Sequence, residues 1–312
     1  MSDGTAARPE RGVAAGVEPK AERPAPRRKI KELEAMVADV VVETPDSATL
    51  VLFTGNERLD YEPGHFLTID PHQFDALERF IAFFEDQKGK KEPPRAYSMC
   101  STPDERYLAV TVKEERYQRG VTKYPPLLSP LLVKRTVRGM RLAVVGFTGP
   151  YVLPADLDAR TDHLVHVVAG SGVVPNLAIL KHALAHFPRV RHTFVYSNKT
   201  WDDVIYRDLL AGLEREHPER LRVVHTLTRD PEAAVRGERV RTGRVSAGLL
   251  AAEIPDPSAC LVYACGPAIS IWDRHRAKEE GTAPAPRFLE SALASLAEIG
   301  VPKDRIKTES YG

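Results

Sequence analysis

A glycine-rich turn is the first stretch of this 312-residue chain whose residues could bind a ligand. Gly170-Ser171-Gly172, followed by Pro175, leaves an apolar run and precedes a helical pattern. Glycines in such a turn let the backbone approach a pyrophosphate, and the free N–H groups of the following helix donate hydrogen bonds to it. Many strand-to-helix turns need glycine only to turn, so the motif alone leaves phosphate binding and an ordinary loop both open.

A second stretch, Arg95-Ala96-Tyr97-Ser98, combines three side chains that suit a flavin. An arginine pairs with phosphate, a tyrosine stacks on a planar ring, and a serine hydroxyl donates a hydrogen bond to a ring nitrogen. The alternative is an ordinary edge strand with an exposed arginine.

Two further stretches lie near the end of the chain. Cys265-Gly266-Pro267 follows the apolar run 261–264, and in doubly wound sheets ligands bind just outside the carboxyl ends of the strands. A buried cysteine is more often only a small apolar side chain. Glu309 and Tyr311 stand at the terminus, where a chain normally frays unless a contact holds it.

The elements that must position these residues change in style along the chain. Up to about residue 157 the sequence has short β-branched segments separated by Pro, Gly, Asn or Asp, which is typical of an antiparallel β-barrel. A helix over 74–87 interrupts them, since Phe74, Leu77, Ile81 and Phe84 recur at spacings of three and four. The predicted strands cover 36–42, 49–53, 65–69, 95–98, 107–112 and 141–145.

Beyond residue 160, continuous apolar runs alternate with helical stretches such as 177–186. This alternation predicts an α/β doubly wound parallel sheet covered on both faces. The runs occupy 163–169, 192–196, 221–227 and 260–264. We therefore expect a disordered tail over 1–29, a β-barrel domain over 30–157 and an α/β domain over 158–312.

Composition excludes several classes of protein. Lys and Arg total 44 against 43 Asp and Glu, and this net charge of +1 lacks the field of a nucleic-acid binder. No run approaches the roughly 18 apolar residues that span a bilayer, and the start of the chain lacks the apolar segment of an export signal, so we expect a cytoplasmic monomer. Three cysteines cannot build a disulfide framework or a four-thiolate cluster, and we expect no metal centre.

The order of these motifs resembles that of the ferredoxin-NAD(P)+ reductase family over residues 30–312. In addition to the four stretches above, 61–66 (Tyr-Glu-Pro-Gly-His-Phe) looks like that family's P-G-Q-F motif. The resemblance implies that the barrel binds FAD, that the α/β domain binds NAD(P), and that the flavin lies between them.

The resemblance also implies roles for single residues. Arg95 would meet the FAD pyrophosphate, Tyr97 would pack on the isoalloxazine or ribityl portion, and Ser98 would hydrogen-bond flavin N5. Glu309 and Tyr311 would close the other face of the flavin. The nicotinamide nucleotide would be held at its pyrophosphate by Gly170, Ser171, Gly172 and Pro175, with Cys265, Gly266 and Pro267 beside the nicotinamide. The implied catalytic set is Ser98, Cys265, Glu309 and Tyr311.

Two positions depart from the family's pattern. Its usual G-P-x-G-x-F turn reads Gly-Phe-Thr-Gly-Pro-Tyr over 146–151. Its flavin-phosphate helix normally starts at a Ser or Thr, for which Ser129 and Thr122 both qualify. We favour Ser129, because the following Pro130 suits an N-cap with proline at the first helical position.

The choice of nucleotide depends on the loop after 192–196. Ser197 or Lys199 could bind a 2′-phosphate, whereas Asp202 and Asp203 would repel it or bind a 2′-hydroxyl. We expect FAD to be the bound cofactor, and we favour NADH over NADPH as the co-substrate that reduces it.

The predicted function is a reductase that passes a hydride from NAD(P)H to FAD and then single electrons to a separate ferredoxin or oxygenase component. Flavodoxin, quinone or ferric reduction would leave the same sequence marks. Two alternatives remain: an electron-relay subunit of a larger complex and a nucleotide-binding protein without enzymatic activity.

Overall fold

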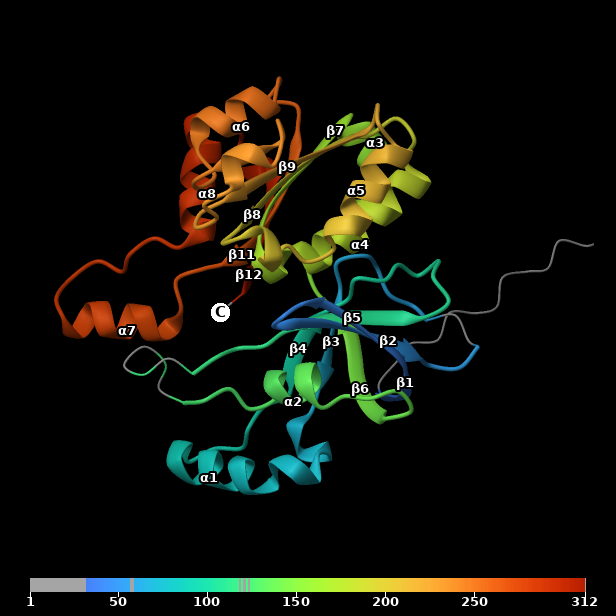
Figure 1. Cartoon of the computed structure of the whole chain (residues 1–312), viewed down its shortest axis with the longest axis vertical. Coiled ribbons are helices and arrows are strands. Elements are labelled where there is room, and N and C mark those ends of the chain that lie inside the picture. The colour runs from blue at the N-terminus through green and yellow to red at the C-terminus, as the bar shows by residue number, and fades with distance from the viewer. Residues whose placement is uncertain (1–31, 57–58, 118, 120–121, 123, 312) are drawn as a thin grey trace, which may run out of the picture.

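The computed structural model describes residues 32–311, apart from 57–58, 118, 120–121 and 123. The tail predicted over 1–29 therefore lies outside the described residues. Figure 1 shows the described chain as two sheets, each with its own helices, that meet beside the end of β12 (Ile306–Tyr311).

The first sheet is antiparallel and closes on itself. Its strand order is β4-β3-β6-β1-β2-β5, and the two outer strands are joined by a bridge between Met99 and Val110. Alternate residues such as Leu50, Leu52 and Leu67 are fully buried inside it. The predicted barrel is confirmed. The strands are β1 (Glu32–Thr44), β2 (Ser47–Phe53), β3 (Phe66–Ile69), β4 (Arg95–Ser98), β5 (Leu108–Lys113) and β6 (Arg141–Thr148).

The helix inserted between β3 and β4 begins later than the apolar spacing indicates. Single 3-10 turns occupy Pro71–Gln73 and Asp75–Leu77, and α1 runs over Glu78–Lys88. Phe74 has extended backbone angles, φ −110° and ψ 105°, which separate the two turns. All four apolar positions of the predicted helix are nevertheless buried, because the short turns keep their side chains on the barrel.

The second sheet is parallel throughout, in the order β10-β9-β8-β7-β11-β12. One core packs α4 and α5 on one face and another packs α6 and α8 on the opposite face, as Figure 1 shows. The predicted doubly wound architecture is confirmed. The other strands are β7 (His163–Ala169), β8 (Arg191–Asn198), β9 (Leu221–Leu227), β10 (Val240–Thr242) and β11 (Leu261–Pro267).

The helices of this half of the chain follow the strands. They are α3 (Leu157–Arg160), α4 (Val173–His186), α5 (Arg207–Glu216), α6 (Ala247–Glu253), α7 (Ile271–Glu279) and α8 (Phe288–Glu298). Short 3-10 turns occupy Gly170–Gly172, Trp201–Asp203, Ala233–Val235 and Lys303–Arg305. Among the described residues no helix is long and apolar enough to cross a membrane.

Four histidines are buried in the second sheet: His163, His166, His192 and His225. Burial lowers the pKa of all four, and that of His166 and His225 falls to about 4. His166 Nδ1 lies 2.9 Å from Oδ1 of the buried Asn176, and its Nε2 lies 3.4 Å from His192 Nδ1. These rings are therefore neutral at neutral pH.

Candidate functional site

The terminal residues are held in the sheet and do not fray. In β12, Glu309 pairs with Cys265 and Tyr311 pairs with Pro267 across the parallel β11–β12 ladder. Tyr311 O also accepts a hydrogen bond of 3.4 Å from Ala268 N. This register places two of the expected catalytic residues, Cys265 and Glu309, at the same level of adjacent strands.

A hydrogen bond between the two sheets brings Ser98 to the same place. The Tyr311 hydroxyl donates to Ser98 Oγ over 2.6 Å, although the residues are 213 positions apart in the chain. Ser98 is the last residue of β4 and is buried, and Tyr311 packs on the core of the second sheet. The four expected catalytic residues therefore converge from β4, β11 and β12.

The Glu309 carboxyl is the titratable group that stands out in this cluster. Its Oε2 is buried without a hydrogen-bond partner among the described residues. Burial raises the pKa of Glu309 to about 7, against a smaller opposing effect of the Ser98 hydroxyl. The neighbouring Cys265 is fully buried, and burial followed by the Glu309 charge raises its thiol pKa. At neutral pH the cluster thus holds a protonated thiol and a carboxyl that readily gains or loses a proton.

The glycine turn lies against the same strand end. Gly170 has φ +53°, and a Cβ on Gly172 would collide with the Cys265 carbonyl oxygen. Only glycine can therefore pass this close to β11 and start α4 at Val173. Gly170 and Ser171 are half-buried, whereas Pro175 is buried in the first turn of α4.

Arg95, the first residue of β4, has an ion-pair partner that the sequence analysis did not predict. Arg95 Nη2 lies 2.5 Å from Glu92 Oε2, and Nη1 donates to Pro93 O. Glu92 is only 1% exposed and also binds Lys88. The acid three residues before Arg95 was the available signal for this pairing. Tyr97, two residues further on, packs against the barrel core.

The prediction that Ser129 caps the next helix is wrong. The helix α2 (Ser129–Lys134) is preceded by Leu128 and has no side-chain cap. Ser129 is buried, and its Oγ accepts a hydrogen bond from Glu115 N over 3.1 Å, so its side chain ties the start of α2 to the segment that follows β5. Thr122 is half-buried in the loop before α2, while Gly120 and Val121 lie outside the described residues.

The residues expected to select the nucleotide follow β8. Ser197 is buried within that strand, and Lys199 is exposed beyond it. Asp203 accepts hydrogen bonds from Thr200 N and Oγ1, which fixes the turn. Asp202 is exposed and lines a cavity of about 600 Å³. Of the two acids, Asp202 is the one left facing solvent.

The clustered residues fit a flavin on three counts. Ser98 Oγ accepts from Tyr311, and its own proton, which interacts with Glu309 in this structure, can be donated to a flavin nitrogen. The buried, unpartnered Glu309 Oε2 can accept a hydrogen bond from a ligand. Arg95 uses two of its nitrogens on Glu92 and Pro93, but a guanidinium has five N–H donors, so it can still meet a phosphate.

Comparison with known proteins identifies relatives of both halves of the chain. The family of oxidoreductase NAD-binding domains matches residues 167–271. The ferredoxin reductase component of 3-ketosteroid-9-alpha-monooxygenase from Mycolicibacterium smegmatis is 33% identical over 288 residues, which cover 89% of this chain and 65% of that protein. This chain therefore spans slightly less than two thirds of the length of that relative.

Two further comparisons cover both sheets. NADH-cytochrome b5 reductase 2 from Homo sapiens is 25% identical over 69% of this chain and 76% of its own length. The FAD/NAD-binding domain of a nitric oxide dioxygenase from Vibrio cholerae superposes with a TM-score of 0.65, at 21% identity, over 91% of this chain and all of that one. The structural likeness establishes the shared two-domain fold.

Proposed function

We propose that the chain is an FAD-containing reductase of the ferredoxin reductase family, which oxidises NAD(P)H and passes single electrons to a separate protein. The observation that carries the proposal is the hydrogen bond between Tyr311 and Ser98, with Glu309 beside it. It joins the barrel to the parallel sheet where the expected reactive residues meet.

Bound FAD would supply the conversion between a two-electron hydride and single electrons. The chain would hold it with Arg95 at the diphosphate, Tyr97 against the ring system and Ser98 at a ring nitrogen. Thr122 and Ser129 are the candidates near the phosphates, the latter through its position and not through a helix cap. We place the FAD-binding domain over 30–157 and the NAD(P)-binding domain over 158–312, with the boundary between β6 and β7.

The chain's own side chains would exchange a proton at the reactive cluster and cover it from water. Glu309 holds or releases a proton at Oε2, since its pKa of about 7 matches neutral pH. Tyr311 excludes water from the cluster, and it would have to move aside for a nicotinamide ring. Gly170, Ser171 and Gly172 would bind the nucleotide pyrophosphate at the start of α4, and Pro175 would shape that start. Cys265, with Gly266 and Pro267, would border the nicotinamide.

We favour NADH as the nucleotide. The exposed carboxylate of Asp202 would repel a 2′-phosphate or accept a hydrogen bond from a ribose hydroxyl, whereas Lys199 or Ser197 would favour NADPH. The relative named an NADH-cytochrome b5 reductase supports this choice. Comparing kcat/KM for NADH and NADPH, in the wild type and in Asp202→Asn, tests it: the preference for NADH should shrink in the variant.

The proposed acceptor is a separate ferredoxin or oxygenase component. The support is the relative named as the reductase component of a monooxygenase. An electron-relay subunit of a larger complex is the alternative. The monomeric state and the location in the cytoplasm stay predictions.

The test of the proposed function uses the purified full chain. We expect one FAD per chain, rapid bleaching of the flavin absorbance by NADH in a stopped-flow spectrometer, and reoxidation by a one-electron protein acceptor. A colourless protein that takes up no FAD would refute the proposal. A protein that is reduced by NADH but reoxidised only within a larger assembly would favour the relay subunit.

A further inference from the structure

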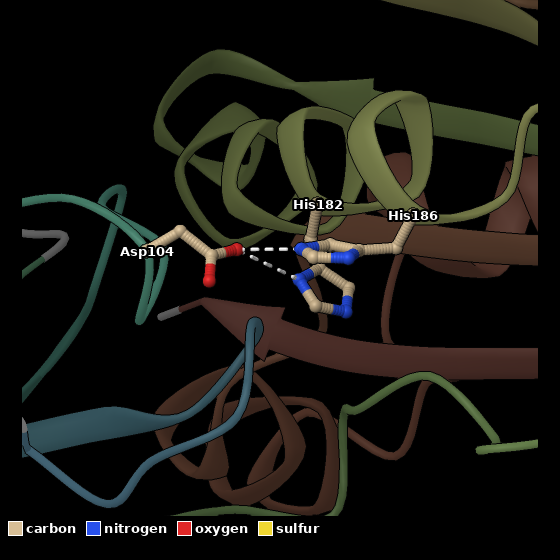
Figure 2. Close-up of side chains that lie close together, drawn as sticks. All are labelled: Asp104, His182 and His186. Carbon is tan, nitrogen blue, oxygen red and sulfur yellow. Dashed lines mark hydrogen bonds and ion pairs between the residues drawn. The ribbon is translucent and has the colours of Figure 1, made fainter. Parts of the chain in front are cut away.

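A second cluster of polar side chains lies away from the Tyr311 site, where α4 faces the barrel. His182 and His186 are one turn apart on α4, and Asp104 belongs to the loop between β4 and β5. Figure 2 shows the Asp104 carboxylate directed at both imidazole rings. The cluster therefore joins the two sheets through side chains from both.

The distances within this cluster suit ligands of a metal ion. Asp104 Oδ2 lies 2.6 Å from His186 Nε2 and 3.8 Å from His182 Nδ1, and the three candidate ligand atoms all lie within 4.8 Å of one another. Metal–ligand bonds of about 2.0 to 2.2 Å in a tetrahedral site separate ligand atoms by roughly 3.3 Å. The two measured separations bracket that value, so small side-chain rotations would seat an ion.

The state of His182 is a second, independent observation. Its Nδ1 is buried without a hydrogen-bond partner among the described residues. An imidazole nitrogen that makes no hydrogen bond within the protein is free to bind a metal ion. A buried polar atom without a partner otherwise destabilises the fold.

We propose that Asp104, His182 and His186 form a binding site for one divalent transition-metal ion, with Zn²⁺ as the preferred ion. Two histidines and one carboxylate are a known zinc ligand set that leaves a fourth position for water. Imidazole nitrogen also disfavours the hard cations Mg²⁺ and Ca²⁺. Glu105, the residue after Asp104, is paired with Lys181 over 2.5 Å and remains outside the set.

The position of the site indicates a structural or regulatory role. The helix α4 starts beside Cys265 at Val173 and ends at His186, and its 14 residues span about 20 Å. The ion would lie near the far end of the helix from the reactive cluster. Since its ligands come from both halves of the chain, it would clamp α4 to the barrel loop. The proposal does not depend on the proposed function.

The test is metal titration of the full chain, purified without a histidine tag and treated with a chelator. Co²⁺ should bind one ion per chain and give visible d–d absorption at longer wavelengths than the flavin. Zn²⁺ should displace it and raise the thermal unfolding temperature. Asp104→Asn and His186→Gln should each weaken Zn²⁺ binding, measured by competition with a chromophoric chelator, by roughly 10- to 100-fold or more.

The matched control is His275→Gln, which removes an exposed histidine on α7. It should leave Co²⁺ and Zn²⁺ binding unchanged. The alternative is a simple ion pair between His186 and Asp104, in which case the variants change stability without any effect of metal. The proposal is overturned if Co²⁺ gives no absorption or if wild type and variants bind Zn²⁺ with equal affinity. A sulfur-to-cobalt charge-transfer band would also overturn it, because it would show that a cysteine binds the ion. Asp104→Asn keeps the side-chain size, so it serves as the test if His186→Gln does not fold.

Discussion

Replacing Glu309 by glutamine should remove a pH dependence of stability that the reactive cluster otherwise imposes on the folded chain. In the folded chain the pKa of Glu309 is about 7, against an ordinary value of 4.5. The native state therefore keeps a proton that the unfolded state has already lost, and stability falls as pH rises from 4.5 through 7. Glutamine is neutral throughout, so this loss disappears in the variant.

The size of the effect follows from that pKa difference. One titrating group changes the free energy of unfolding by at most about 1.4 kcal/mol per pH unit. Between pH 4.5 and 7 the free energy of unfolding falls by at most about 3 kcal/mol. The actual loss is smaller, because Glu309 is partly exposed and solvent screens its charge. The difference in stability between Glu309→Gln and wild type should be near zero at pH 4.5 and reach its maximum above pH 7, with the variant more stable.

The assay is urea unfolding followed by tryptophan fluorescence at several pH values, at equal flavin content. The chain has two tryptophans, Trp201 and Trp272, and both lie in the half that contains β12. Other titrating groups contribute equally to both proteins, so the difference isolates Glu309. Glu298→Gln, at an exposed glutamate at the end of α8, is the control. Parallel pH profiles for wild type and Glu309→Gln would refute the reasoning.

Three further predictions concern ligand binding. Arg95→Ala should weaken FAD binding by roughly 1.5 to 3 kcal/mol, because a charge-assisted pair is lost. Flavin fluorescence titration measures the change, and unchanged affinity would show that Glu92 keeps Arg95 away from the phosphates. Cys265→Ser should retain its flavin but slow reduction by NADH, and a wild-type stopped-flow rate would make Cys265 a packing residue only. Deleting the last two residues should tighten nicotinamide binding by about 1 kcal/mol, because Tyr311 no longer has to be displaced; equilibrium binding constants that match the wild type would contradict its role as a cover.

The sequence predicts the two sheets well because each has its own hydrophobic pattern. Short segments separated by turn residues indicate the barrel, and continuous apolar runs indicate the buried parallel strands. The strand β12 has neither pattern, because Ile306–Tyr311 is largely polar. It is an edge strand with one neighbour, so its backbone pairing holds it without a continuous apolar run.

The sequence predicts which motifs make up the site, but it does not predict which side chains pair with one another. The convergence of Ser98, Glu309 and Tyr311 follows from topology once both sheets form. The pairing of Arg95 with Glu92 depends on loop geometry, and local propensity does not encode it. The spacing of His182 and His186 suggests two ligands on one helix face, yet Asp104 comes from a distant loop that only the folded chain brings near.

The buried histidines give the parallel sheet an intrinsic acid limit. Where strands of this type ordinarily carry aliphatic side chains, His163, His166, His192 and His225 fill the interior as uncharged rings. Their lowered pKa values mean that this stability is complete above about pH 6.5 and is lost as pH falls toward 4, the reverse of the Glu309 trend. Protonation would place positive charges on adjacent strands, with His166 and His192 nitrogens 3.4 Å apart. The interior of the parallel sheet is therefore uncharged only near neutral pH. We expect acid to unfold this half of the chain by protonating its buried histidines.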